Sequence, residues 1–312
     1  MPDSAVLCDP RASRSAPSLS PLPILHVPTH RRFGPAFAVE PTHLADVDVW
    51  DVDQLVARGV ELVHLHGGFD DVAPTEMWNW CEQLAAGGIR LAVTVHDLDN
   101  PRHADQLQHH ERLRALIHHA HALFTLTTSA NTELVRRWGR PATVVPHPRM
   151  APAELRAAVR HRPAVDRPVL VWLGACRANV DIDAVVDLIE HCDQPIEVVA
   201  RLDGWDALAD CHRERLVDAV CRSRQGELVI TGRPDDTELV ELIAHRRALV
   251  LPHRWGTHSS LVQLARELGV PAIVPAVGCH ADQGAIVGPA SELAELLATV
   301  ARCAPTVDPS LS

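Results

Sequence analysis

The feature of this sequence that most constrains its fold is the alternation of short, β-branched apolar runs with longer amphipathic segments. Five runs in the first half of the chain predict strands, at residues 23–27, 61–66, 90–95, 122–127 and 142–145. Apolar residues at helical spacing fill the intervals, at residues 51–59, 74–86, 104–121 and 130–139. A helix between successive strands predicts parallel strands joined by right-handed crossovers.

The same pattern restarts after a proline-containing segment, residues 151–166, which we expect to be a linker with a short helix. Further strands are predicted at residues 169–173, 196–200, 228–231, 248–251 and 272–275, and helices at 181–191, 207–223, 237–245, 259–268 and 291–302. We therefore predict an α/β fold of two doubly wound, Rossmann-like domains, residues 23–150 and 167–303, with a disordered leader (1–22) and a tail (304–312). Ligands of such sheets bind beyond the carboxyl ends of the strands, so the cleft between the domains is the expected site.

Composition excludes several classes of function. No apolar run approaches the roughly 20 residues that a membrane helix needs. The first twenty-odd residues lack the apolar core of a secretory signal, and we expect a cytoplasmic protein. The eight cysteines are scattered without any Cys-x-x-Cys pair, which predicts free thiols. A net charge of −11 and the lack of a basic stripe disfavour nucleic acid as a partner.

The chain contains no lysine, so all 29 basic residues are arginines. Any phosphate must therefore be held by arginine, by backbone N–H groups or by hydroxyls. The best-placed candidate is Arg177, which follows the first strand of the second domain; its planar guanidinium matches phosphate geometry. A surface ion pair of Arg177 with Asp181 or Asp183 is the alternative.

Two strands of the first domain end in polar or glycine-rich turns. Residues 91–97 deliver His96 and Asp97 to a strand end, where His96 can donate to a sugar hydroxyl or a phosphate oxygen, or else cap local backbone. Asp97 and Asp99 spell Asp-x-Asp, but this triplet is common by chance, and we assign no metal to it. Gly67 and Gly68 follow another strand and permit close approach of a ligand, although a plain turn explains them equally well.

Hydroxyl groups gather at one predicted helix start in the second domain. Residues 255–263 read WGTHSSLVQ, which places Gly256 beside Thr257, His258, Ser259 and Ser260. The free N–H groups and the dipole of a helix start form an anion site. Helix capping alone would also explain the hydroxyls. In the histidine-rich run at residues 103–121, His118 and His121 share a helix face, but no cysteine or carboxylate completes a metal site with them, and we interpret the run as a solvated helix face.

The order of these motifs is similar to that of GT-B glycosyltransferases of the family-4 type, over about residues 23–302. The resemblance rests on residues 125–129 (TLTTS), 133–139 (ELVRRWG), 144–148 (VVPHP), 256–260 (GTHSS) and 267–275 (ELGVPAIVP). It implies a nucleotide-sugar donor on the second domain, an acceptor on the first, where we expect it beside Gly67 and Gly68, and transfer without a metal or a cofactor. It further implies that His96 contacts the donor sugar, and that Arg177 and the helix start at Ser259 and Ser260 bind the donor diphosphate. We predict His96 and Asp97 as the catalytic residues.

The chain departs from this family at several positions. No lysine follows Arg177, and residues 28–34 (PTHRRFG) replace a glycine-rich loop. Trp255 and Gln263 stand where the family has two glutamates, one for the donor sugar and one for the ribose. We expect Gln263 to contact the ribose and Trp255 to pack on the sugar, unless both fill a collapsed pocket.

The predicted function is transfer of a sugar from a nucleotide-sugar donor to a glycan or lipid-linked acceptor, in polysaccharide or glycoconjugate synthesis. A glycosyltransferase-like protein that binds without transferring sugar, and a sugar-nucleotide epimerase on the same fold, are the alternatives.

Overall fold

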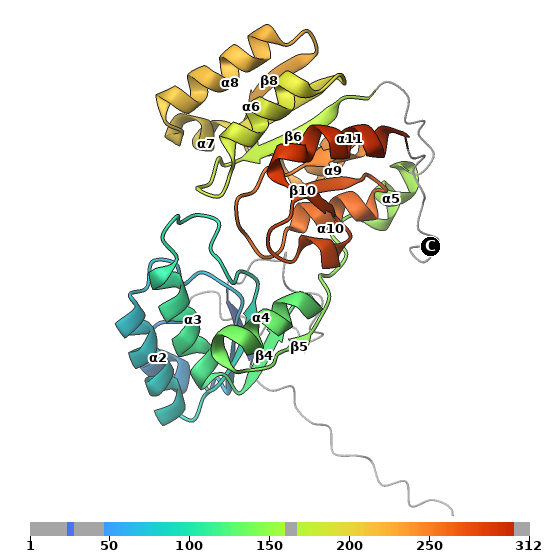
Figure 1. Cartoon of the computed structure of the whole chain (residues 1–312). Coiled ribbons are helices and arrows are strands. Elements are labelled where there is room, and N and C mark those ends of the chain that lie inside the picture. Colours follow the sequence, from blue (N-terminus) through green and yellow to red (C-terminus); the bar gives the residue numbers. More distant parts are fainter. Residues whose placement is uncertain (1–23, 28–46, 160–166, 303–312) are drawn as a thin grey trace, which may run out of the picture.

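The computed structural model describes residues 24–27, 47–159 and 167–302 and arranges them as two α/β domains joined by one connection (Figure 1). The predicted leader, the loop at residues 28–34 and the tail lie outside the described residues, as do residues 160–166 of the predicted linker.

The first domain contains a parallel five-stranded sheet whose spatial order is the chain order. Its strands are β1 (Ile24–Val27), β2 (Leu62–Leu65), β3 (Arg90–Val95), β4 (Ala122–Thr125) and β5 (Thr143–Val144). The helices are α1 (Val52–Ala57), α2 (Pro74–Ala86), α3 (Leu107–His119) and α4 (Thr128–Trp138). Each strand and helix overlaps the segment predicted for it, because a parallel βα unit repeats a strong apolar pattern.

The two faces of this sheet differ in chemistry. Side chains alternate between faces along a strand, so Val63 and Leu65 of β2 share one face with Val93 and Val95 of β3. These four side chains are at most 2% exposed and pack in one core with apolar residues of α2 and α3. The opposite face instead carries histidines, among them His26 of β1 and His64 of β2.

The second domain contains a parallel six-stranded sheet with the order β11-β10-β9-β6-β7-β8. Its strands are β6 (Val169–Gly174), β7 (Ile196–Arg201), β8 (Gly226–Thr231), β9 (Leu249–Val250), β10 (Ala272–Pro275) and β11 (Ile286–Gly288). The chain starts at β6, runs outward to β8, and then returns to β9 on the other side of β6. This reversal is the topological switch point of a doubly wound sheet, where a crevice opens at the carboxyl ends of the strands.

The helices of this half are α5 (Ala153–Val159), α6 (Ile182–His191), α7 (Leu202–Ala207), α8 (Asp210–Arg222), α9 (Asp236–Ala244), α10 (Ser260–Glu267) and α11 (Leu293–Arg302), with 3-10 turns η2 (His280–Gln283) and η3 (Ala290–Glu292). No helix in the described part of the chain combines the length and apolar character needed to cross a membrane.

Two elements differ from the sequence prediction. The helix expected at residues 207–223 is α8, and the short helix α7 before it was not predicted; the two are separated by extended backbone at Leu208 and Ala209. Strand β11 was not predicted, since its three residues, which end in Gly288, are too few to display an alternating pattern. It adds an edge to the sheet beside β10.

Gly204 in α7 fixes how closely the turn after β6 approaches that helix. A Cβ atom at position 204 would lie 2.1 Å from the carbonyl carbon of Ala175. The turn that it touches leads directly to Arg177, so this glycine contact sets the position of the predicted phosphate ligand.

We predict that Gly204→Ala lowers the free energy of unfolding by about 1–3 kcal/mol or more, because backbone must move to relieve the overlap. Urea unfolding measures the change. Gly232→Ala is the matched control, since Gly232 is exposed and has no atom within 4 Å of the added methyl group. Equal stability of the two variants would contradict the prediction.

Candidate ligand-binding cleft

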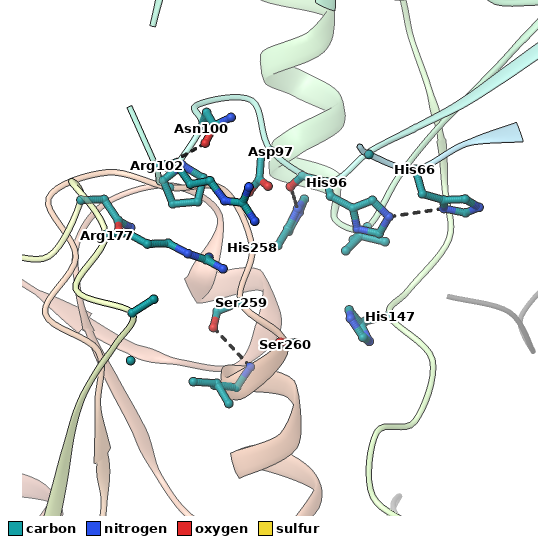
Figure 2. A pocket seen from close by; sticks show the side chains of 18 of the residues that line it. His66, His96, Asp97, Asn100, Arg102, His147, Arg177, His258, Ser259 and Ser260 are labelled. Carbon is teal, nitrogen blue, oxygen red and sulfur yellow. Dashed lines mark hydrogen bonds between the residues drawn. The ribbon is translucent and has the colours of Figure 1, made fainter. Parts of the chain in front are cut away.

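The two domains enclose a cavity of about 680 Å³. Its walls come from the turns after β2 and β3 of the first domain and after β6, β7 and β8 of the second, together with the start of α10. Figure 2 shows His66, His96 and Asp97 on one side of this space and Arg177, Ser259 and Ser260 on the other. The cleft therefore lies at the carboxyl ends of both sheets, as the sequence predicted.

Residues 255–259, which we name the crossing segment, connect the second domain to the first by hydrogen bonds. The Thr257 hydroxyl accepts from the backbone N–H of Leu98 at 2.6 Å, and the Trp255 indole Nε1 donates to the carbonyl of Asn100 at 3.0 Å. Thr257 is 1% exposed, so these bonds are shielded from water. They hold the turn after β3 against the second domain.

His258 adds a second link between the domains. Its Nδ1 lies 2.8 Å from the carbonyl oxygen of His96, and its Nε2 lies 2.9 Å from the hydroxyl of Thr127. Burial, the main cause, lowers the pKa of His258 to about 4, so the ring is neutral at pH 7. Since a carbonyl only accepts, Nδ1 carries the proton, and Nε2 accepts from Thr127.

Five arginines line the cavity: Arg102, Arg149, Arg177, Arg201 and Arg233. Three of them follow neighbouring strands of the second sheet, so that β6, β7 and β8 each deliver one guanidinium to the same edge. Among the residues that the structure describes, three carboxylates line the same cavity: Asp70, Asp97 and Asp236. A chain of net charge −11 therefore concentrates positive charge in this cleft.

Among the described residues, none forms a hydrogen bond or an ion pair with the Arg177 guanidinium. Arg254, and not Arg177, pairs with Asp181 at 3.4 Å and with Asp183 at 3.8 Å, so the surface ion pair considered above is formed by a different arginine. The Arg177 side chain reaches into the cavity from the second domain, and the Arg102 side chain extends toward the same space from the first (Figure 2). Desolvation and then repulsion by Arg102 lower the pKa of Arg177, although a guanidinium stays protonated.

Asp97 and His96 have protonation properties suited to proton transfer and hydrogen bonding. Burial raises the pKa of Asp97 to about 7, against the opposing field of Arg177. Burial and the neighbouring His66 lower the pKa of His96 to about 3, so this ring is a neutral donor and acceptor at pH 7. The Asp99 carboxylate, by contrast, accepts two hydrogen bonds from the Arg137 guanidinium, at 2.8 and 3.0 Å. Its Oδ1 also lies 2.9 Å from Nε2 of His110.

The start of α10 faces the cavity through Gly256, His258, Ser259 and Ser260. Ser259 is the N-cap residue, and its hydroxyl accepts from the N–H of Leu261 at 3.2 Å, so capping accounts for this hydroxyl. Ser260 is exposed at the first turn of the helix. Gly256 has a φ of 153°, a conformation that a residue with a side chain rarely adopts.

Three residues predicted to bind the donor lie outside the cavity wall and have partners in the protein. Thr257 and Trp255 form the links between domains described above. The Gln263 side-chain amide donates to the carboxylate of Glu267 at 2.9 Å. That carboxylate also accepts from the backbone N–H groups of Met150 and Ala151, which fixes the end of the interdomain connection. Gly67 and Gly68, predicted on the acceptor side, do line the cavity.

Arg201 and Arg233 were not predicted as site residues. Both stand directly at or just after a predicted strand, in the runs VVAR and VITGR. The same reasoning that selected Arg177, a cation at the carboxyl end of a parallel strand, would have selected them. Arg149 gave no such signal, because it lies in the connection between the domains.

No protein-family model and no curated protein sequence matches this chain. Several solved structures do match its fold. A structure of HepE from Anabaena in complex with UDP has a TM-score of 0.58 at 12% identity, over 80% of this chain and 71% of that one. Sucrose-phosphate synthase from Thermosynechococcus elongatus has a TM-score of 0.57 at 18% identity, over 80% and 67% of the two chains. An α,α-trehalose-phosphate synthase (UDP-forming) from Burkholderia xenovorans has a TM-score of 0.55 at 13% identity, over 84% and 71%. These similarities confirm the predicted GT-B fold.

The raised pKa of Asp97 predicts that this residue affects the stability of the fold in a pH-dependent way. In the folded chain Asp97 holds its proton up to about pH 7, whereas an unfolded aspartate loses it near pH 3.8. Below about pH 3.8 the ionisation of Asp97 therefore takes nothing from the free energy of unfolding. Above that pH the buried carboxyl lowers the free energy of unfolding increasingly, until the pH passes about 7. We predict that Asp97→Asn stabilises the fold more at pH 8 than at pH 5, by on the order of 2 kcal/mol. Denaturant unfolding at both pH values measures this difference. The exposed Asp218→Asn should show no such dependence, and parallel behaviour of the two variants would disprove the assignment.

A second prediction concerns the substitution of Gln263. Gln263→Glu would restore the carboxylate of the resembled family but would set it against Glu267, its present hydrogen-bond partner. We expect the free energy of unfolding to fall by about 1–2 kcal/mol at pH 8, from the lost hydrogen bond and like-charge repulsion. Nucleotide binding should not improve, as titration calorimetry would measure. The exposed Gln225→Glu serves as control; tighter binding by the Gln263 variant would return this residue to the donor site.

Proposed function

We propose that this protein is a glycosyltransferase of the family-4 type, which moves a sugar from a nucleotide-sugar donor to a glycan or lipid-linked acceptor. The observation that carries the proposal is the gathering of five arginines around one cleft of a GT-B fold, in an acidic chain without lysine. A diphosphate is the ligand group that such an array fits, because each guanidinium offers paired donors to phosphate oxygens.

In this proposal the diphosphate lies between Arg177, Arg201 and Arg233 at the strand ends of the second domain. The start of α10 adds backbone N–H groups and its dipole from the side of Ser259 and Ser260. Arg201 is already oriented by an ion pair with Asp203. Placing the diphosphate here directs the sugar toward His96 and Asp97 on the opposite wall.

Transfer then needs little covalent chemistry from the protein. An acceptor hydroxyl attacks the anomeric carbon as the bond from that carbon to the diphosphate oxygen breaks. Asp97, with a pKa of about 7, accepts the hydroxyl proton. His96 donates a hydrogen bond to the sugar, and the arginines stabilise the charge on the departing nucleoside diphosphate. Gly67 and Gly68 provide room on the acceptor side.

We further propose that this transfer requires no metal at the donor diphosphate. In support, Asp99 of the Asp-x-Asp triplet is occupied by Arg137 and His110, which leaves Asp97 as the single carboxylate of the triplet on the cavity wall. The arginines take the charge-neutralising role that a metal has in other phosphate sites.

A non-catalytic binding protein is the second candidate. It is favoured by Trp255 and Gln263, which replace the two glutamates of the resembled family and contact other parts of the protein instead of the cavity. Incubation with donor separates the two functions, since a transferase slowly hydrolyses or transfers the sugar and a binding protein returns it intact.

The first experiment is a thermal-shift screen with nucleoside diphosphates and their sugars, starting with UDP and UDP-glucose because HepE has been solved with both. Binding to the folded state raises the midpoint of unfolding by mass action. Absence of any shift across uracil, guanine and adenine diphosphates would remove the nucleotide-sugar assignment.

We predict that Arg177→Ala weakens binding of the nucleoside diphosphate by about 1.5–3 kcal/mol, the scale of a charge-assisted hydrogen bond. Titration calorimetry compares it with Arg222→Ala, which removes an exposed arginine paired with Glu190 outside the cavity. The control should bind like the parent chain. Equal affinities of all three proteins would exclude Arg177 from the site.

A further inference from the structure

Three histidines gather on the face of the first sheet that is opposite to its apolar core. His26 of β1 and His64 of β2 are direct partners in the parallel register, and His66 follows His64 by two residues. Residues two apart share a face of a strand, so all three rings project to the same side. His64 and His66 are 4% and 7% exposed, and the His64 and His66 ring centroids lie 4.1 Å apart.

The nitrogen atoms of these rings converge. His26 Nδ1 lies 3.5 Å from His66 Nε2, and one ligand atom from each of the three residues lies within 4.8 Å of the others. Two nitrogens bound to one tetrahedral zinc ion at about 2.0–2.1 Å are about 3.3–3.4 Å apart. The pair His26 and His66 therefore already has nearly the spacing of a metal-bound pair, and His64 needs a shift of the order of 1 Å.

We propose that His26, His64 and His66 form a binding site for a divalent transition-metal ion, with Zn²⁺ as the representative ion. Three imidazoles with one position left for solvent is a ligand set that zinc accepts. His66 also lines the cleft and contacts His96, so this site borders the proposed donor site. The inference itself rests on the convergence of the three imidazoles and requires no transferase activity.

Further contacts orient two of these rings. The Nε2 atom of His64 lies 2.8 Å from the hydroxyl of the buried Thr94, so the proposed site would use Nδ1 of His64. The Nδ1 atom of His66 lies 3.5 Å from Nε2 of His96 (Figure 2). Metal on Nε2 of His66 would leave the ring proton on Nδ1, directed at His96. Such outer contacts hold metal-binding histidines in one tautomer.

Other histidines of the chain do not gather in this way. Among the residues that the structure describes, these three are the one group of histidine, cysteine or carboxylate side chains close enough to share an ion. His118 and His119, in the histidine-rich stretch of α3, pack instead against Trp78. The H-x-H pattern at residues 64–66 is short, and His26 is 38 residues away from His64 in the sequence. The sequence pattern alone therefore does not show this cluster.

The test uses the full chain without a polyhistidine tag, stripped with EDTA and then titrated with Co²⁺ and Zn²⁺. We expect one ion per chain, a visible Co²⁺ spectrum of the tetrahedral type, and displacement of Co²⁺ by Zn²⁺. His26→Gln and His66→Gln should each weaken Zn²⁺ binding at least about 100-fold, since loss of an outer contact alone costs 10–100-fold. His103→Gln, at an exposed position, is the control.

Circular dichroism of the metal-free variants checks that each still folds. Should a variant fail to fold, zinc-edge X-ray absorption of the unaltered chain decides the question, because it counts imidazole ligands directly. Three imidazoles around the ion support the site. Fewer imidazoles, no bound ion, or variants that bind like His103→Gln would overturn it.

Discussion

The arrangement of the candidate site depends on the hydrogen bonds that the crossing segment makes to the first domain. Thr257 and His258 contact the backbone at Leu98 and His96, which are the residues on either side of Asp97. The turn that carries Asp97 is therefore held from the second domain, not only by its own strand. Because Gly256 and Ser259 continue the same segment into the cavity wall, one short stretch of chain positions both sides of the cleft.

His258 shows how this link is specified. Its neutral ring donates through Nδ1 to a carbonyl and accepts through Nε2 from Thr127, whose hydroxyl oxygen in turn accepts from the N–H of Ala130 at the start of α4. Each donor in the series meets one acceptor. A charged imidazole would direct a donor at Thr127 as well as at the carbonyl of His96. The observed hydrogen bonds therefore suit the neutral ring, which burial also favours.

The fold was largely predictable from the sequence, and the site only in part. Strands such as β2 and β3 are buried and β-branched, and the helices between them have clear apolar stripes, so their order implied parallel sheets. Arg177, His96 and Asp97, which all line the cavity, were selected because each stands at a strand end. Thr257, Trp255 and Gln263 were given a ligand because their residue types fit one. Gln263 contacts Glu267, which lies one helical turn away in α10, a spacing that the sequence does show. The partners of Thr257 and Trp255, at Leu98 and Asn100, instead depend on domain packing and are more than 150 residues distant in sequence. Local pattern contains no information on such contacts.

The absence of lysine has a consequence for the chemistry of the cleft. A pocket built with lysine presents nucleophilic amines, which acetyl donors, reducing sugars and reactive aldehydes modify once the amine loses its proton. Guanidinium groups stay protonated throughout the range in which proteins are stable, and they are poor nucleophiles. The five arginines of this cavity thus keep their full charge in alkaline solution and in the presence of reactive sugars. Amine-directed reagents have no side chain to label here, whereas dicarbonyl reagents such as phenylglyoxal address the cavity wall itself.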